Sequence, residues 1–286
     1  MLKFLKDWLA SKLVEESFYV PGTLPPRVRE FAKRGVRYRA AGKGLGLTAN
    51  DRRLLHFHNR HAGQRCFVMG NGPSLNKCDL SKLRNEITFG FNSIFLNREK
   101  MGFDPTYYVV EDVLVAEDRQ KEINAYHGPK SKFFGDYLSC FLEGASDVVW
   151  MNVRVRYDEY PGFPHFSKNA ARELWVGGTV SYVALQLVYY MGFRQVYLIG
   201  FDHYYSTPPD VKKEGLRWTS MSSDPNHFHP DYFGKGYRWH SPEVQRMERA
   251  LRRADEYYRS DGRSIMNATV GGKLEVFPRV DYNSLF

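Results

Sequence analysis

The sequence predicts an α/β fold: a mostly parallel, Rossmann-like sheet with helices on both faces and a lid-like insertion. Two observations support this prediction. From residue 65 onward, short apolar runs of strand type alternate with helical patterns, which is typical of parallel sheets whose strands are joined by helices. Several of these runs end in glycine, asparagine or acidic residues, as expected where a ligand binds beyond the carboxyl ends of the strands.

The composition fits a soluble folded protein. Hydrophobic residues make up 43% and charged residues 26% of 286 residues, which excludes a disordered chain, collagen or a coiled coil. No apolar run of about 20 residues appears, so we expect no transmembrane helix. The N-terminus lacks a signal-peptide pattern, and the three cysteines form neither a zinc motif nor a disulfide framework. We therefore expect a cytoplasmic location.

The expected elements follow the apolar runs in order. A helix is expected over 179–191, closed by Gly192, and another over 243–259, closed near Gly262, because glycine commonly ends helices. The strand candidates are 66–69, 87–92, 107–110, 132–134, 148–151, 195–199 and 264–267.

The chain divides into a basic N-terminal helix and arm over 1–64 and a nucleotide-binding catalytic domain over 65–286, with the lid at about 203–240. Leucines recur at helical spacing over 3–16 among lysines, which predicts an amphipathic basic helix. This helix either packs on the domain or makes a peripheral contact with the inner face of an anionic membrane. A loop-rich arm is expected to follow it.

The net charge of +9 suits an anionic partner or substrate. The sequence contains no long Lys/Arg block, zinc finger or RNA-recognition signature, so we do not expect nucleic-acid binding. The sequence leaves a homo-oligomer open.

The run Gly70-Asn71-Gly72-Pro73-Ser74-Leu75 follows the first strand candidate. Glycines let the backbone approach phosphates, and a following helix offers free N–H groups. Asn71 suits a base, ribose or phosphate, and Ser74 suits a helix cap or a phosphate. The alternative is a plain strand-to-helix turn, since neither a Walker loop nor a G-x-G-x-x-G fingerprint is present.

Two further runs carry candidate residues. Gly177-Gly178-Thr179 opens the helix at 179 and presents N–H groups and a hydroxyl to a phosphate, or else only caps the helix. Asp202-His203-Tyr204-Tyr205 follows the clearest strand. Its carboxylate suits a ribose, a metal or a sugar hydroxyl, and its tyrosines suit a departing phosphate.

Histidines gather in the expected lid: His203, His227, His229 and His240 lie between 203 and 240. Their near-neutral pKa suits a general base, although a lone histidine is more often structural. Metal binding by His227 and His229 is not favoured, because no cysteine partner is evident.

The order of these motifs resembles two related families. One is the bacterial sialyltransferase family that uses CMP-sialic acid, and the other is the group named after the archaeal 6-hydroxymethylpterin diphosphokinase (MptE-like). The second matches over about 60–286 and shares the Rossmann-like fold and the glycine-rich start. The matching runs are 70–75, Phe91-Asn92, Gly178-Thr179, 198–204, 224–228, His240-Ser241 and 267–274.

The resemblance implies roles for individual residues. Nucleotide contacts are implied for Asn71, Gly72, Ser74, Asn92, Gly178 and Thr179. We expect Gly70 and Asp202 to contact the nucleotide as well, because each follows a strand. Phosphate stabilisation is implied for Tyr204, with Tyr205 as its partner. His240 resembles the general base that deprotonates the acceptor hydroxyl. His227 and His229 remain alternatives to it, because the loop is longer here than in the sialyltransferases.

One acidic pair departs from the sialyltransferase pattern. Glu111 and Asp112 stand where those metal-independent enzymes have none, and such a pair beyond a strand suits Mg²⁺. The alternative is an ion pair with a nearby Lys or Arg.

Three functions follow as hypotheses. The leading one is a glycosyltransferase that moves a sialic-acid-like sugar from a CMP-activated or other nucleotide donor to a glycan or lipid-linked acceptor, without a cofactor. The second is an Mg²⁺- and ATP-dependent diphosphokinase acting on a pterin-like alcohol, with Glu111, Asp112 and Asp202 on the metal. The third is an inactive nucleotide-binding scaffold that docks on a membrane complex through 1–16.

Overall fold

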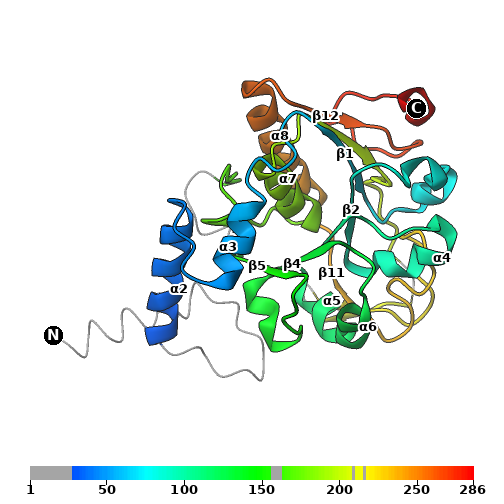
Figure 1. The fold of residues 1–286 in the computed structure, drawn as a ribbon. Helices are drawn as coiled ribbons and strands as arrows, with labels where there is room; N and C mark the ends of the chain where they lie inside the picture. The colour runs from blue at the N-terminus through cyan, green and yellow to red at the C-terminus, as the bar shows by residue number, and fades with distance from the viewer. Residues whose placement is uncertain (1–27, 156–162, 208–209, 215–216) are drawn as a thin grey trace.

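A computed structural model describes residues 28–155, 163–207, 210–214 and 217–286 (Figure 1). Its centre is a seven-stranded sheet in the order β12-β8-β1-β2-β3-β4-β5, and every pair of neighbouring strands is parallel. The predicted strands and Rossmann-like α/β fold are confirmed. The strands are β1 (Arg65–Met69), β2 (Thr88–Phe91), β3 (Tyr107–Val110), β4 (Ser131–Gly135), β5 (Val148–Met151), β8 (Gln195–Ile199) and β12 (Ser264–Asn267).

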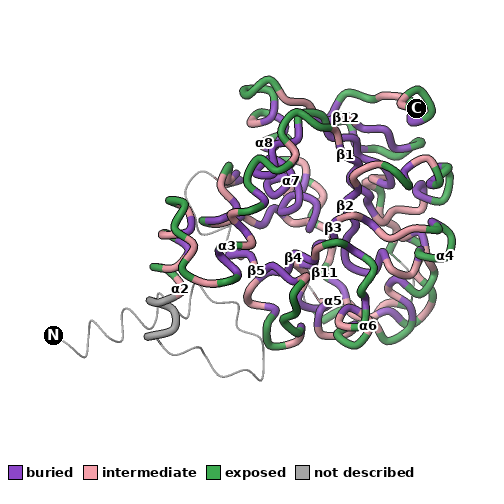
Figure 2. The backbone as a smooth tube through the Cα atoms, in the orientation of Figure 1, coloured by how far each residue is buried: buried purple, intermediate pink, exposed green. Residues whose placement is uncertain are grey.

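Both faces of this sheet are buried, as the purple strands in Figure 2 show. Side chains alternate between the two faces along a strand. In β1, Cys66 and Val68 join one apolar cluster, whereas Phe67 and Met69 join the other. Strands that are covered on both sides read as continuous apolar runs, which is why the sequence revealed them.

Helices cover both faces (Figure 1). The predicted helices are present as α7 (Val180–Tyr190) and α8 (Val244–Ser260), which pack on each other. α7 is buried along its whole length, and Thr179 caps its first turn. The other face carries α5 (Val113–Asp118) and α6 (Gln120–Ala125). The remaining helical segments are α4 (Arg98–Met101), η1 (Pro73–Lys77), η2 (Leu80–Leu83), η3 (Asn92–Asn97), η4 (Asp136–Cys140) and η5 (Tyr282–Leu285).

The N-terminal part differs from the expected loop-rich arm. Within the described residues it contains α2 (Val28–Ala41) and α3 (Ala49–His56). Thr48 and Asp51 form a reciprocal cap at the start of α3, an arrangement that satisfies two free N–H groups. The Asn50 side chain then bonds both the N–H and the carbonyl of Trp150 in β5. The region just before residue 65 is therefore part of the sheet domain, while the helix predicted over 3–16 lies outside the described residues.

The insertion between β8 and α8 contains a small antiparallel sheet. Buried Arg119 donates to the carbonyls of Asp231 and Tyr232, and Arg238 pairs with Asp118. These bonds attach residues 224–240, within the lid predicted over about 203–240, to the α5–α6 region. The strands here are β9 (Lys212–Glu214), β10 (Arg217–Thr219) and β11 (Arg238–His240), and a separate pair is β6 (Val153–Arg154) and β7 (Leu174–Trp175).

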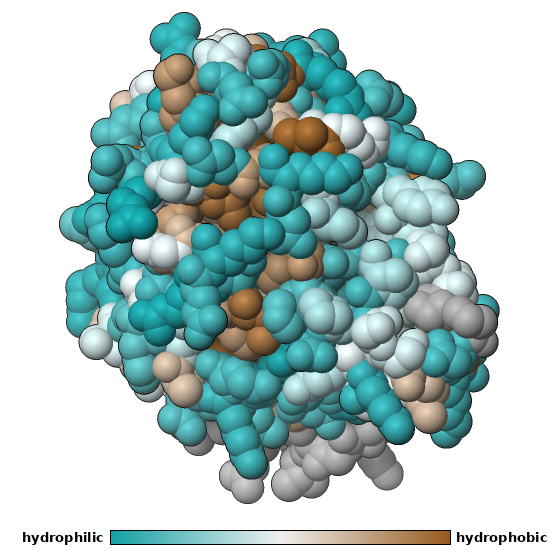
Figure 3. All heavy atoms as spheres, turned by 90° about the vertical axis from the view of Figure 1, so that its right-hand side faces the viewer, coloured by the Kyte–Doolittle hydropathy of each residue, from teal (hydrophilic) through white to brown (hydrophobic). Residues whose placement is uncertain are grey.

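The exterior is mostly hydrophilic on the face beside the C-terminus, with apolar groups in small separate patches (Figure 3). Among the described residues, no helix is both long and apolar enough to cross a membrane.

Candidate functional site

A cavity of about 560 Å³ opens at the carboxyl edge of the central sheet. Its walls include the residues that follow the neighbouring strands β1 and β8. After β1 the chain continues to β2 on one side of this pair, and after β8 it continues to β12 on the other side. Such a switch in strand order is where open α/β sheets bind ligands. The structure brings most of the predicted site residues to this cavity: Gly70, Asn71, Gly72, Asn92, Glu111, Asp112, Gly178, Thr179, Asp202, Tyr204, Tyr205, His227 and His240.

His240, on β11, lies beside Asp112 in the lining of the cavity. The His240 Nδ1 lies 3.6 Å from Oδ2 of Asp112. Oδ1 of Asp112 accepts the N–H groups of Leu114 and Val115 at the start of α5, so the helix fixes the carboxylate. A carboxylate that holds one imidazole nitrogen leaves the other nitrogen to act on a substrate. Asp112, a metal ligand in the alternative hypothesis, is therefore placed to orient His240.

The acidic pair and His240 perturb one another electrostatically. The interaction with Asp112 raises the pKa of His240, and the charge on Glu111 adds to this effect. Burial raises the pKa of Glu111 to about 8, with a further contribution from Asp112. Perturbed titrating groups that meet in a cleft are typical of functional sites.

The exposed fraction of each histidine separates the alternatives. His203 pairs with Glu248 and its side chain is 7% exposed, whereas His227 pairs with Asp224 and is 15% exposed. The side chain of His240 is 46% exposed. Among the histidines that line the cavity, His240 is thus the most open to a substrate.

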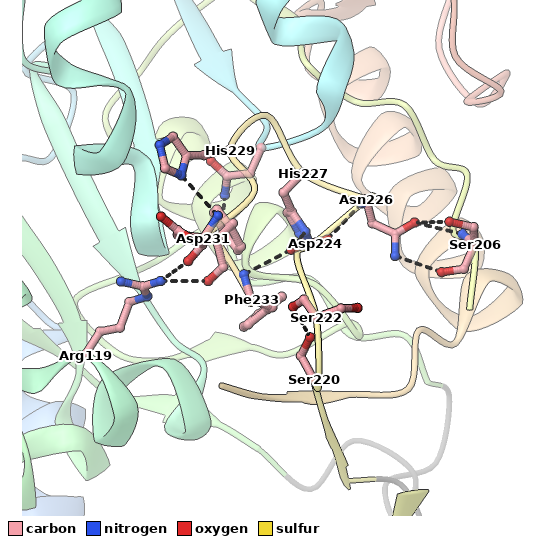
Figure 4. Close-up of polar contacts among 12 residues, drawn as sticks. Arg119, Ser206, Ser220, Ser222, Asp224, Asn226, His227, His229, Asp231 and Phe233 are labelled. Carbon is pink, nitrogen blue, oxygen red and sulfur yellow. Dashed lines mark hydrogen bonds and ion pairs between the residues drawn. The ribbon is translucent and has the colours of Figure 1, made fainter. Parts of the chain in front are cut away.

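His227 and His229 are held by contacts within the insertion itself. Figure 4 shows Asp224 holding both His227 and the N–H of Phe233. The His227 ring also stacks on Tyr232 at 3.9 Å between centroids. His229 accepts the N–H of Asp231 (Figure 4) and does not line the cavity. His229 is therefore not brought to the site.

Two asparagines present unsatisfied oxygens in the cavity walls. The Oδ1 atoms of Asn71 and Asn92 are buried without a hydrogen-bond partner. The Nδ2 of Asn71 donates to the hydroxyl of Tyr232 at 2.8 Å, which fixes the direction of its amide. Asn92 has a positive φ of 47°, a conformation that asparagine tolerates better than most residues. Since buried acceptors are usually paired, a ligand with N–H or O–H donors fits here.

The side chain of Asp202, which follows β8, reaches into the glycine-rich turn after β1. Its carboxylate accepts the N–H of Ser74 at 3.1 Å and the Ser74 hydroxyl at 2.5 Å. A Cβ on Gly72 would lie 2.0 Å from the Asp202 Oδ2, so this glycine makes room for the carboxylate. Ser74 is buried and does not line the cavity. The donors expected to hold a phosphate here thus already hold an internal anion.

The start of α7 offers another place for an anion. Gly178, with φ at 83°, precedes the capping residue Thr179. A Cβ on Gly178 would lie 3.5 Å from Cδ of Arg246, and Arg246 itself lines the cavity. Arg246 is not among the site residues predicted from the sequence. Its one signal was its place in the first turn of the helix that follows His240 and Ser241.

The two tyrosines lie in different surroundings. Tyr204 is 57% exposed, and the Lys273 ammonium lies 4.3 Å from the centre of its ring. Burial raises the pKa of Tyr205 to about 12, helped by Asp202. Tyr205 therefore stays protonated and able to donate at neutral pH.

The carboxylates of the cavity are only partly free to hold a metal. Within the described ranges, no group of three or more His, Cys, Asp or Glu residues has the arrangement of a metal site. Asp202 is bonded to Ser74, and Asp112 is bonded at the start of α5. An Mg²⁺ ion would have Glu111 and one oxygen of Asp112, and would need substrate phosphates or water for its other ligands.

The fold defines a Rossmann-like α/β protein, and its cavity at the topological switch point is the candidate ligand site. Residues 47–208 match the family model described as 6-hydroxymethylpterin diphosphokinase MptE-like. The match covers more than half of the chain, and the chain belongs to this family. The predicted resemblance to the MptE-like group is thus confirmed.

Comparisons with other proteins add distant likenesses only. No curated protein matches the sequence. The MAf glycosyltransferase of Magnetospirillum magneticum AMB-1 is 15% identical with a TM-score of 0.49, over 91% of this chain and 41% of that one. The sialyltransferase CstII of Campylobacter jejuni, solved with cytidine-5'-monophosphate, is 15% identical with a TM-score of 0.43, over 78% of this chain and 86% of that one. The chain thus spans about two fifths of the length of the first of these proteins.

Proposed function

We propose that the chain is a glycosyltransferase that uses a CMP-activated, sialic-acid-like donor and a hydroxyl of a glycan or lipid-linked acceptor. The observation that carries this proposal is the exposed His240, held by Asp112 on the wall of the 560 Å³ cavity. A neutral imidazole with one nitrogen fixed by a carboxylate is suited to take a proton from a hydroxyl.

The proposed reaction is a direct displacement at the anomeric carbon of the donor sugar. The free Nε2 of His240 takes the proton of the acceptor hydroxyl while the hydroxyl oxygen forms a bond to the anomeric carbon. The bond from the carbon to the phosphate oxygen breaks, and CMP leaves with both electrons. Tyr205, which is protonated at neutral pH, would turn its hydroxyl from the Met247 sulfur to donate a hydrogen bond to this phosphate, with Tyr204 as its partner. No metal is required by this step.

The donor is proposed to lie across the ends of β1 and β8 toward the start of α7. The unpartnered Oδ1 atoms of Asn71 and Asn92 need donors from the ligand, and the cytosine amino group and the ribose hydroxyls are such donors. Arg246 and the turn at Gly178 suit the phosphate. The bonds between Asp202 and Ser74 favour this end of the cavity over the turn after β1 for the phosphate.

A second candidate is the diphosphokinase activity that the family description names. The specific observation in its favour is the acidic pair Glu111–Asp112 beyond β3, which lines the cavity and would hold Mg²⁺ together with nucleotide phosphates. A pterin would also satisfy the asparagine oxygens, because it carries amino and N–H donors. The pairing of Asp112 with His240 favours the transferase.

Ligand-dependent thermal stability separates the two candidates. The purified chain is heated with CMP, CDP, UDP or ATP, each with Mg²⁺ or with EDTA. The transferase predicts a higher melting temperature with CMP that persists in EDTA, since any ligand that binds only the native state stabilises it. Stabilisation by ATP alone, and only with Mg²⁺, would replace the transferase by the kinase. No stabilisation by any of the four nucleotides would overturn both.

A further inference from the structure

A second hollow, a groove of about 710 Å³, lies far from the catalytic cavity. Its walls come from α3 and from the amino ends of β4 and β5, at Ser131 and Asp147. Because all strands of the sheet are parallel, this is the sheet edge opposite the catalytic cavity. In Figure 1, α2 and α3 lie together beyond the β5 end of the sheet, and α3 packs on β5.

The rim of this groove is basic. Arg52, His56 and Arg60 are exposed, and Arg53 stands between them. Nη1 of Arg53 donates to two backbone carbonyls, but its buried Nε has no hydrogen-bond partner.

One acid faces these cations, and it is already engaged. Asp147 lines the groove and lies 3.3 Å from the Lys132 ammonium. The groove therefore keeps an excess of positive charge. Its other lining side chains include the apolar groups of Phe57 and Val149, so an anion with an apolar part fits better than a bare ion.

Two exposed leucines continue this surface. The Leu45 and Leu47 side chains are 58% and 59% exposed. Between them, the carbonyl of Gly46 accepts a hydrogen bond of 3.1 Å from Nη1 of Arg52, which ties the leucine loop to the basic rim. Apolar side chains flanked by arginines are typical of segments that rest in a membrane interface.

We propose that this surface, made of Leu45, Leu47, Arg52, Arg53, His56 and Arg60, docks on an anionic phospholipid membrane. The arginines meet the phosphate headgroups and the leucines enter the interface. A free phosphate or a nucleic acid would use the arginines but leave the leucines without a role. Docked in this way, the protein keeps its catalytic cavity, at the opposite sheet edge, toward the aqueous side. This inference does not depend on the proposed transferase activity.

Vesicle sedimentation with the full chain tests the proposal. Vesicles of phosphatidylcholine with phosphatidylglycerol are compared with vesicles of phosphatidylcholine alone. The parent chain is expected to bind the anionic vesicles more tightly, and added salt should weaken this binding. Each basic residue near an anionic surface contributes about fivefold in partition, so Arg52→Gln with Arg60→Gln should lower it about 25-fold. Leu45→Ser with Leu47→Ser should lower it by about tenfold or more.

Matched variants make the outcome decisive. Lys121→Gln with Lys235→Gln removes the same charge at two other exposed positions and should change the partition much less. Arg52→Lys with Arg60→Lys should retain it, because a membrane surface responds to charge. The proposal is overturned if the Arg52→Gln, Arg60→Gln variant or the Leu45→Ser, Leu47→Ser variant binds anionic vesicles like the parent. It is overturned as well if the Lys121→Gln, Lys235→Gln control loses as much binding as the arginine variant. It is also overturned if free phosphate or RNA competes fully while the Ser pair is unaffected. Circular dichroism confirms that each variant is folded.

Discussion

Nδ1 of His240 and Oδ2 of Asp112 lie 3.6 Å apart, although the two residues belong to different parts of the fold. Asp112 lies two residues beyond the end of β3 and caps α5, whereas His240 ends β11 in the insertion. The cavity is therefore completed by the insertion. The contact also sets the protonation of His240, because a neighbouring carboxylate favours the imidazolium.

Replacing His240 by Ala should lower the turnover of the proposed transferase by about 10²–10⁴-fold, the usual contribution of a general base. Nucleotide affinity should be nearly unchanged, because the base acts on the acceptor. Steady-state kinetics and calorimetry with CMP measure the two effects. Turnover at the parent level would remove His240 from the mechanism.

Replacing Asp112 by Asn should change the pH dependence of the rate. The neutral form of His240 is the base, so the parent rate rises as the pH passes the raised pKa of this histidine. Without the carboxylate the pKa of His240 falls. The acid limb of the pH–rate profile, where the rate rises with pH, should therefore move to lower pH while the maximal rate decreases. An amide can still cap α5, so a purely structural role for Asp112 predicts an acid limb that stays in place.

Glu111→Gln should stabilise the protein at alkaline pH. The pKa of Glu111 is about 8 in the folded protein against an ordinary value of 4.5, so the folded state binds a proton that the unfolded state has lost. Stability from this group is complete below about pH 4.5 and is lost as the pH rises to about 8. The variant should lack this decline, and its free energy of unfolding near pH 8 should exceed that of the parent by on the order of 4 kcal/mol. Urea unfolding at several pH values measures it, and equal slopes in both proteins would contradict the raised pKa.

Asn71→Ala should weaken nucleotide binding through the loss of its Oδ1. Removing one acceptor of a buried hydrogen bond costs about 1–2 kcal/mol, or roughly tenfold in affinity. Tyr232→Phe is the matched control, because it removes the Tyr232 partner of Asn71 but leaves the Oδ1 in place. Calorimetry should show a much smaller change for Tyr232→Phe. Equal losses of nucleotide affinity in the two variants would show that the effect comes from the broken Asn71–Tyr232 hydrogen bond and not from a lost contact with the ligand.

The sheet and the cavity were predictable because their signals are local. Each central strand is a short apolar run, and the residues that follow it gather at one edge by the geometry of parallel strands. The helix α2 was missed because it follows two prolines and has Gly35, a residue of low helix propensity, in the middle. These features favour a loop when the partner surface is unknown.

The pairings within the cavity were not predictable in the same way. The turn at Ser74 offers the same donors to a phosphate and to Asp202, and only proximity in the fold shows that the internal carboxylate holds them. The same holds for Asp112, whose carboxylate suits a metal equally well until His240 is found beside it. The sequence pattern predicted most of the residues that line the cavity, whereas the partners of these residues depend on how distant parts of the chain meet in the fold.

Arg238 should act as a positioning residue for His240. Arg238 and His240 lie two positions apart on β11, and the Asp118 and Asp112 carboxylates hold them at the two ends of α5. The backbone N–H of Arg238 also donates to Asp118 at 2.8 Å. Arg238→Met removes the side-chain bonds but keeps much of the apolar stem. This variant should lower turnover about tenfold and shift the acid limb toward lower pH, because His240 loses its alignment with Asp112. Arg238→Lys, which retains the charge, should recover part of both effects. A role confined to stability would lower the melting temperature of Arg238→Met and leave the pH profile where it is in the parent.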